Sequence, residues 1–281
     1  MFGVGVGIRV GGFTPISGGG GFDPDAQAFF DRVTIAGGTL TTTEKNATNQ
    51  LVLDMKSAGI WSAMKAVYPM VGASAAACAQ NLKSSSFTGT FTSGWTFAST
   101  GVTPNGFSAY MNTGLNIGTV LTQTNSHASF YSRSSSDTSG FPTVIGAYGN
   151  TSYTTAIDLH IRRPAPGDIG GGQLGSFTIS SVSFTETDAR KFAILSRTSA
   201  TSLKYYTTGV LRATNTTSDT TGFGSVTAYI GAGNYVTGVA QNFSVLQCAF
   251  ASLGDGLTDT QASNFYTAVQ AFQTTLARQV V

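Results

Sequence analysis

The sequence predicts a mainly β protein, a sandwich of two antiparallel sheets with a small helical piece before it and an amphipathic helix after it. Three observations favour this fold class. From about residue 84 to residue 251, apolar and polar residues alternate with a period of two. Clusters of Gly, Asn, Asp and Ser repeatedly interrupt that alternation. No helical pattern lies between these strands, which favours packed antiparallel sheets over a parallel α/β sheet.

The pattern divides the 281 residues into three parts. These are a glycine-rich N-terminal arm (1–22), a helical attachment subdomain (23–70), and the β-sandwich with its C-terminal helix (71–281). The arm has the parity of a strand with one apolar face, made by Phe2, Val4, Val6, Ile8 and Val10. We expect either a disordered arm or a strand that docks onto a partner's sheet. A phosphate-binding loop is the third interpretation, but no βαβ unit supports it.

The helical subdomain is predicted from its start and stop signals. Asp23 followed by Pro24 begins one helix, and Thr41 with Glu44 forms a capping box for a second. A short third helix is expected over 60–67, ending before Pro69. Because three short helices make only a marginal core, we expect them to pack on the β body or on a neighbouring subunit.

The strands of the body follow in order. We expect them at 87–91, 94–98, 107–112, 128–133, 143–148, 154–162, 176–184, 191–197, 203–208, 225–230 and 243–251. The clearest alternation places Ile157, Leu159 and Ile161 on one face of a strand and Asp158 and His160 on the other. The first face should be buried and the second should meet solvent.

The C-terminal run closes the body. Residues 243–251 are apolar on both faces, which predicts a central strand. After a turn at 254–256, Thr258 and Gln261 form a capping box. The helix that follows carries one apolar stripe that must pack on the sheet, formed by Ala262, Phe265, Tyr266, Val269, Phe272 and Leu276.

Composition limits the partners. Charged residues make up only 10% of the chain, the net charge is +2, and no long basic run is present, so nucleic acid is not an expected partner. No apolar run reaches the roughly 18 residues of a membrane span, so no membrane partner is expected either. Cys78 and Cys248 are far apart in sequence, and we expect buried thiols rather than a disulfide.

Catalytic chemistry has little support. Glycosidases need paired carboxylates, and the chain has only two glutamates. Glu44 belongs to a helix cap. Glu186 and Asp188 would lie on the same face of a strand, but the next residue on that face is Arg190 rather than a third acid. His127 and His160 lack metal-ligand spacing. We therefore expect no enzyme activity, no catalytic residues and no cofactor.

Two kinds of binding site stay open. Asp137 in SSSDTSG and Asp219 in TTSDTTG are weak calcium candidates, and ordinary turn formation is the alternative for both. Aromatic rings beside amides can bind sugar, because a ring stacks on a pyranose while amides bond its hydroxyls. The candidates are Tyr148, Asn150, Tyr153, Asn234 and Tyr235. The pair Arg162–Arg163 is interpreted as a solvated strand end rather than an anion site.

Four segments carry a resemblance to a known family. They read GLTDTQASNFYTAVQAFQTTLARQ (256–279), SHASFYSRSSSD (126–137), GWTFASTGVTPNGFSAYMNTGLN (94–116) and KSAGIWSAMKAVYPMVG (56–72). From about Asp23 to its end, the chain resembles a module of bacteriophage virion proteins found in tail, fibre and capsid-surface components. That module resembles the concanavalin A-like, laminin-G-like jelly roll.

The resemblance implies a virion structural protein. The expected form is an outward-facing tail or fibre adhesion module in a homo-oligomer, attached to other virion proteins through its arm and able to bind a host surface glycan. A capsid decoration or head-fibre protein without a ligand is one alternative. A polysaccharide depolymerase is another, although the family module offers no catalytic motif to carry over.

Overall fold

The computed structural model describes residues 21–280 apart from 139, 165–166 and 237. The proposed docking residues Phe2, Val4, Val6, Ile8 and Val10 lie outside the described residues. No helix in the described part is long and apolar enough to cross a membrane.

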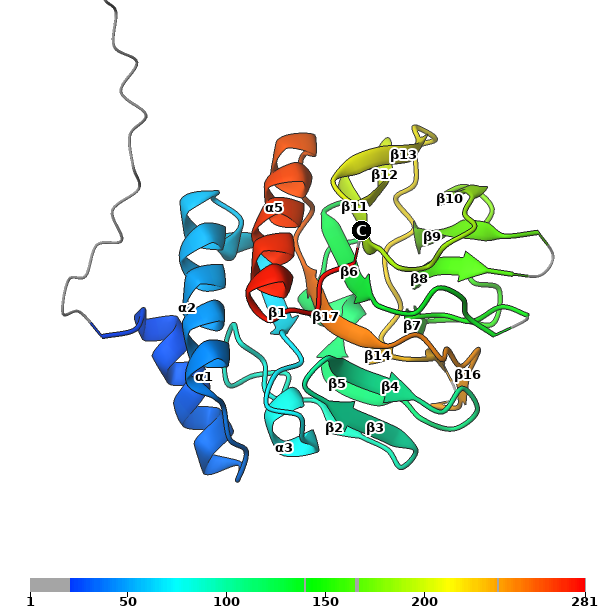
Figure 1. Cartoon of the computed structure of the whole chain (residues 1–281). Coiled ribbons are helices and arrows are strands. Elements are labelled where there is room, and N and C mark those ends of the chain that lie inside the picture. The colour runs from blue at the N-terminus through cyan, green and yellow to red at the C-terminus, as the bar shows by residue number, and fades with distance from the viewer. Residues whose placement is uncertain (1–20, 139, 165–166, 237, 281) are drawn as a thin grey trace, which may run out of the picture.

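The described chain forms three layers (Figure 1). Helices α1 (Pro24–Ile35), α2 (Thr42–Ser57) and α5 (Asp259–Thr275) make one layer. The inner sheet lies next to it and the outer sheet lies on the far side, so that one face of the outer sheet has no helical layer over it. This confirms the predicted mainly β sandwich.

The inner sheet has the order β13-β12-β11-β6-β17-β4-β3, with β1 paired to β17. Its strands are β1 (Met64–Tyr68), β3 (Trp95–Ala98), β4 (Gly101–Pro104), β6 (Ser126–Ser132), β11 (Phe192–Ser199), β12 (Ser202–Thr207), β13 (Val210–Asn215) and β17 (Cys248–Gly254). The strand predicted at 243–251 is central but displaced along the chain: β17 spans Cys248–Gly254 and has neighbours on both sides, and residues 243–247 lie in the connection before it.

The outer sheet has the order β10-β9-β8-β7-β14-β5-β2, with β15 and β16 attached beside β7. Its strands are β2 (Thr90–Phe91), β5 (Met111–Asn116), β7 (Ile145–Tyr148), β8 (Ala156–Arg163), β9 (Ile169–Gly175), β10 (Ser181–Thr185), β14 (Thr227–Ile230), β15 (Gly233–Tyr235) and β16 (Ala240–Gln241). Short helices α3 (Ala75–Cys78) and α4 (Ile117–Val120) lie in connections. The strand pairs in both sheets are antiparallel, except for β15 with β7.

Local signals place the helix ends as predicted. The Asp23 carboxylate accepts a hydrogen bond from the Asp25 amide at the start of α1. Capping boxes open α2 and α5, where the Thr41 amide donates to the Glu44 carboxylate at 2.8 Å and the Thr258 amide donates to Gln261 Oε1 at 3.0 Å. Each box satisfies amides that a helix start leaves without intrahelical partners.

The predicted third helix over 60–67 is wrong. Residues Trp61–Ala63 form one 3₁₀ turn, and Met64–Tyr68 then form β1, which pairs antiparallel with β17. Ala66 and Tyr68 enter the core between the sheets, while Met64 and Val67 pack against the helices. Tertiary pairing overrides the helical spacing here, because a strand buries side chains on both of its faces.

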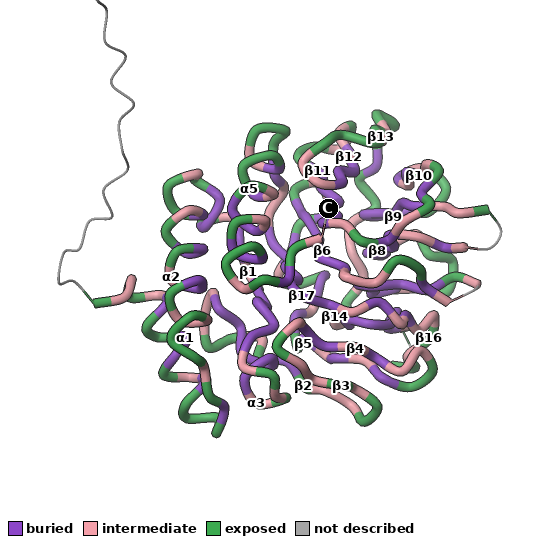
Figure 2. The backbone as a smooth tube through the Cα atoms, viewed as in Figure 1, coloured by how far each residue is buried: buried purple, intermediate pink, exposed green. Residues whose placement is uncertain are grey.

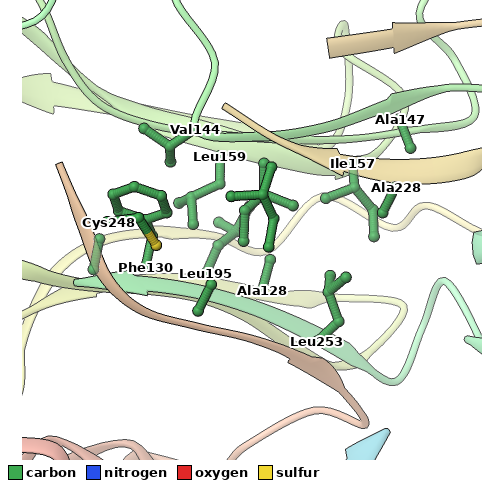
Figure 3. Close-up of a cluster of buried hydrophobic side chains, with 14 of the residues drawn as sticks. Ala128, Phe130, Val144, Ala147, Ile157, Leu159, Leu195, Ala228, Cys248 and Leu253 are labelled. Carbon is green, nitrogen blue, oxygen red and sulfur yellow. The ribbon is translucent and has the colours of Figure 1, made fainter. Parts of the chain in front are cut away.

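Two apolar cores hold the layers together. Figure 3 shows part of the core between the sheets, where Phe130, Ile157, Leu159 and Leu195 meet. The other core lies between the inner sheet and the helices, and Phe265, Val269 and Phe272 of α5 are buried in it, as the stripe predicts. Cys78 and Cys248 are free and buried, which confirms the thiol interpretation.

The expected solvent face of β8 is a second correction. Ile157, Leu159 and Ile161 point into the core as predicted, but Asp158 and His160 are each only 6% exposed. Figure 2 shows β8 and β9 largely buried although they lie at the side of the molecule opposite the helices. The two polar side chains lie at the bottom of a groove that neighbouring strand and loop residues line on this face of the outer sheet.

Candidate functional site

The groove consists of two adjoining cavities on the free face of the outer sheet. The first has a volume of about 330 Å³ and is lined by Phe141, Tyr148, Tyr153, Asp158, Arg163, Gln173, Phe177, Tyr235, Gln241 and Asn242. The second has about 230 Å³ and is lined by Phe141, Asp158, His160, Arg163, Ile169, Gly172, Gln173, Phe177, Ser181, Val182 and Ser183. The first lies within the roughly 300–1,000 Å³ of ordinary small-molecule sites.

Three tyrosines form one wall of the first cavity, named here the tyrosine wall. Tyr148 and Tyr235 are stacked with their ring centroids 4.6 Å apart. Tyr153 meets both edge to face, at 5.5 Å from Tyr148 and 5.9 Å from Tyr235. Such aromatic pairs stabilise one another beyond the area that they bury, so the wall is held in place before any ligand arrives.

Two glycines allow this wall to form. The chain after β14 turns back and lays β15 parallel to β7, with Gly233 opposite Gly146 and Tyr235 opposite Tyr148. A Cβ atom on Gly146 would lie 2.7 Å from the Cα of Gly233, closer than real Cβ atoms approach backbone. Glycine at this position therefore permits the close approach that brings Tyr235 onto Tyr148.

An ion pair forms the floor that the two cavities share. Arg163 Nη2 lies 2.9 Å from Asp158 Oδ2, and both residues are at most 9% exposed. The guanidinium also donates to the Pro142 carbonyl and to Thr143 Oγ1. Burial alone would raise the pKa of Asp158, but the positive charge of Arg163 outweighs burial and holds that pKa below its ordinary value. The carboxylate is therefore ionised and paired at neutral pH.

His160 lies beside this pair in the second cavity. Its Nε2 is 3.5 Å from Arg163 Nη1, and its Nδ1 has no hydrogen-bond partner, with Asp158 Oδ1 3.5 Å away. Burial lowers the pKa of His160, and the positive charge of Arg163 lowers it further. The imidazole is therefore neutral at pH 7, and its Nδ1 is buried without a hydrogen-bond partner.

Exposed aromatic rings stand at the rim. Phe141 is 63% exposed, Phe177 is 56% exposed and Tyr153 is 40% exposed. Arg163 lies 5.8 Å from the centre of the Phe141 ring. Single exposed apolar side chains are ordinary, but several gathered around one cavity are typical of a binding surface. The groove thus combines flat apolar rings with amide, imidazole and carboxylate groups, a combination that suits a sugar.

The sequence-predicted sugar residues divide into two groups. Tyr148, Tyr153 and Tyr235 come together in the groove. Asn150 does not line it, because both ends of its amide bond to Thr154. Asn234 is 3% exposed, and its side-chain amide donates to the Thr227 carbonyl, so it connects β15 to β14 and does not face the groove.

The interpretation of Arg162–Arg163 as a solvated strand end is wrong for Arg163. Arg162 pairs with Asp168 at 2.7 Å near the surface, whereas Arg163 is buried in the groove. Residues five apart on a regular strand lie on opposite faces, so alternation separates Asp158 from Arg163. A register shift between His160 and Arg163, where β8 pairs with β9, puts both on the same face.

Sequence reasoning missed several groove residues besides Arg163. They include Phe141, Asp158, His160, Gln173, Phe177, Gln241 and Asn242. A signal was available for Asp158 and His160, which share the polar face of the clearest alternating strand. Phe141 stands in a loop and carried no periodic signal. Phe177 was expected in a strand over 176–184, but β10 begins only at Ser181 and Phe177 lies in the turn before it.

The carboxylates of the two calcium candidates, Asp137 and Asp219, accept hydrogen bonds from other groups of the protein. Asp137 accepts hydrogen bonds from the Val245 amide and the Ser244 hydroxyl, and Asp219 accepts from the Ser176 and Thr221 amides. Among the described residues, no group of three or more His, Cys, Asp or Glu side chains converges as a metal site would require.

The remaining acid and histidine candidates lie outside the groove. Glu186 is buried between Lys191 and Arg212, and Asp188 pairs with Arg190. His127 lies under α5, where Nδ1 is 2.6 Å from the Asp255 carbonyl and Nε2 is 3.0 Å from the Ser252 hydroxyl.

Comparison with known proteins establishes the fold. No protein-family model matches the sequence, and neither does any curated protein. Among solved structures, domain 4 of AbnA, a GH43 extracellular arabinanase from Geobacillus stearothermophilus in complex with arabinotriose, is similar. The TM-score is 0.50 at 13% identity, over 72% of this chain and 98% of that chain. The likeness is one of fold.

A second solved structure is the CBM40 domain of the Ruminococcus gnavus IT-sialidase bound to alpha2,3 sialyllactose. It aligns with a TM-score of 0.36 at 15% identity, over 48% of this chain and 78% of that chain. The two-sheet topology and the likeness to the arabinanase domain identify the architecture as a jelly-roll β-sandwich.

Proposed function

We propose that this chain is a glycan-binding adhesion module, and that the groove on the outer sheet is where it binds. The observation that carries the proposal is the tyrosine wall beside the Asp158–Arg163 floor, with Phe141 and Phe177 exposed at the rim. Rings of this kind stack on the apolar faces of sugars, and nearby polar groups bond the hydroxyls. The similar arabinanase domain, solved in complex with arabinotriose, adds support.

We propose further that the groove binds without cleaving. Glycoside hydrolysis needs two carboxyl groups about 5 to 10 Å apart on either side of the scissile bond. Asp158 is the one carboxylate among the described groove residues, and its pairing with Arg163 leaves it poorly suited to give or take a proton.

The proposed setting is a bacteriophage virion. The resemblance of segments 94–116, 126–137 and 256–279 to phage tail, fibre and capsid-surface modules motivates this part of the proposal. In this account the helical layer and the arm lie toward the particle, and the groove, on the opposite face of the sandwich, is directed at the host. Homo-oligomers attached to other virion proteins are the proposed assembly.

A glycan array with groove variants tests the binding function. Phe141→Ala and Phe177→Ala remove exposed rings at the rim, so they should leave the fold intact. We expect the wild type to bind a defined set of glycans and each variant to lose roughly tenfold in affinity, about 1.4 kcal/mol. Phe107→Ala is the matched control, since Phe107 is 72% exposed and does not line the groove.

Absence of any specific glycan signal from the wild type would contradict the binding function. Equal losses for Phe107→Ala and the rim variants would contradict the location. Incubation of the strongest-binding oligosaccharide with the protein tests the non-catalytic role, because shortened products would reveal hydrolysis. Mass spectrometry and immunogold imaging of purified particles test the virion setting, which fails if the chain is not a particle component.

A further inference from the structure

The groove differs along its length. The tyrosine wall lines only the first cavity, while His160, Ser181 and Ser183 line only the second. Five residues line both, so the two cavities adjoin: Phe141, Asp158, Arg163, Gln173 and Phe177. At about 230 Å³ the second cavity is below the usual size of an independent small-molecule site. It is better explained as a continuation of the first.

The groove floor carries little net charge. Asp158 is the single acidic residue and Arg163 the single basic residue among the described lining residues, and they pair with each other at 2.9 Å. Arg163 also donates to the Pro142 carbonyl and to Thr143, so its guanidinium is largely occupied. A sugar carboxylate placed here would meet the Asp158 carboxylate without a free cation to compensate for it.

The second cavity holds a polar atom that has no partner. His160 is buried, and its Nδ1 makes no hydrogen bond within the protein. Asp158 Oδ1 lies 3.5 Å from that nitrogen. Nδ1 has almost no accessible surface, so a ligand hydroxyl can accept from Nδ1–H only if the imidazole turns toward the cavity; satisfying a donor that is otherwise buried at a cost favours that turn.

We propose that the groove binds at least two consecutive units of a neutral oligosaccharide. One ring stacks in the first cavity against the tyrosine wall, and the next occupies the second cavity, where it places a hydroxyl beside His160. This inference rests on the proposed glycan-binding function and adds to it the minimum length and the charge of the ligand.

Titration calorimetry with sugars of increasing length tests the inference. The probes are gluco-, manno-, galacto- and arabino-oligosaccharides of one to five units, and oligogalacturonides and sialyllactose as acidic counterparts. For a series that binds, affinity should rise at least tenfold from one unit to two or three and then level off. Neutral sugars should bind at least tenfold more tightly than acidic ones.

Two variants separate the cavities. Ser183 is exposed, so Ser183→Trp should fold normally while its indole blocks the second cavity. We expect it to reduce binding of the longer sugars to the level of the single unit. His160→Ala should do the same, with an unchanged near-UV spectrum as the check on folding. Ser85→Trp, at an exposed loop position outside the groove, is the matched control.

The outcomes are distinct. Binding that is equally tight for one unit and for three, or tighter binding of the acidic series, overturns this inference and leaves glycan binding itself standing. Length dependence that survives Ser183→Trp also overturns it, because the extra units then bind elsewhere. If no sugar binds in calorimetry or on the array, the proposed function fails and the inference fails with it.

Discussion

Arg163 and Asp158 are five residues apart on β8, yet their side chains form a 2.9 Å ion pair on one face of the outer sheet. The register shift between His160 and Arg163 makes this possible. Without that bulge, Arg163 would point toward the apolar core between the sheets. The bulge therefore sets both the floor of the groove and the pairing of its only charged lining residues in the described chain.

The pair should show strong energetic coupling. Arg163→Ala leaves the Asp158 carboxylate buried without its partner, so we expect the free energy of unfolding to fall by roughly 3 to 5 kcal/mol. The double variant Asp158→Asn/Arg163→Ala should recover part of that loss, because no unpaired charge remains. Urea denaturation of the two single variants and the double variant measures the coupling. Simple additivity would contradict the pairing.

Gly146 should be intolerant of a side chain. In Gly146→Ala the new methyl group meets the backbone of Gly233, so β15 must shift and Tyr235 must lose its stacking on Tyr148. Overpacking of this kind costs roughly 1 to 3 kcal/mol. We expect a lower melting temperature together with weaker glycan binding. Gly21→Ala is the control, since nothing lies within 4 Å of its added Cβ. Equal melting temperatures would show that the contact does not matter.

Acid should destabilise the fold through His127. Burial lowers the pKa of His127 from 6.5 to about 4, although its hydrogen bond to the Asp255 carbonyl acts in the other direction. The unfolded chain therefore binds more protons between these two values, so stability falls as the pH drops from 6.5 toward 4. This one group should cost on the order of 2 kcal/mol between pH 7.5 and pH 5.

Urea titrations at the two pH values check this prediction. His127→Gln removes the titrating group, so it should flatten the pH dependence even if it lowers stability at pH 7.5. His160 contributes with the same sign, because its pKa is lowered too, so His127→Gln should retain a smaller slope. An unchanged slope in His127→Gln would refute the assignment.

Arg278 should anchor the end of the chain. It is 1% exposed and donates to the carbonyls of Met70, Pro69 and Ala249 at 2.8, 2.6 and 2.9 Å. Burial lowers the pKa of Arg278 to about 10, so the side chain stays charged at neutral pH. Arg278→Ala leaves several buried carbonyls without donors and should cost roughly 3 kcal/mol or more.

Lysine should not rescue that variant, because its single ammonium cannot reproduce the planar fork of donors. Thermal melting of Arg278→Ala and Arg278→Lys measures both effects, with exposed Arg190→Ala as the control, which we expect to stay within about 0.5 kcal/mol of wild type. A melting temperature of Arg278→Ala close to that of Arg190→Ala would argue against the anchor.

The N-terminal arm should be the tether in the proposed virion setting. Deletion of residues 1–20 removes the whole apolar strand pattern of Phe2 to Val10 and none of the described sandwich. We expect the shortened protein to fold, to bind glycan as before and to be missing from purified particles. Incorporation at the normal level would mean that another part of the chain makes the attachment.

Local signals made much of the fold predictable. Capping boxes at Thr41 and Thr258 depend on residues three apart, and the α5 stripe depends on spacing within one helix, so no tertiary knowledge was needed. Strand β1 was missed because Met64–Tyr68 has helical spacing but pairs with β17, which lies far along the chain. That pairing is a property of the assembled sheet.

The site was predictable in part for the same reason. Tyr148, Tyr153 and Tyr235 were recognisable as aromatic residues at turns, and the sheet brings them together. The floor could not be predicted, because the bulge that brings Arg163 beside Asp158 breaks the period of two on which the prediction rests. Asn150 was misjudged because its amide is used within its own turn.

A crystal structure of the protein in complex with the strongest-binding oligosaccharide from the array would show directly where the ligand binds. We expect one sugar ring against Tyr153 or Tyr235, which are at least partly exposed, and hydroxyls within hydrogen-bond distance of groove side chains such as Asp158 and His160. Sugar density on another surface, with the groove empty, would contradict this expectation.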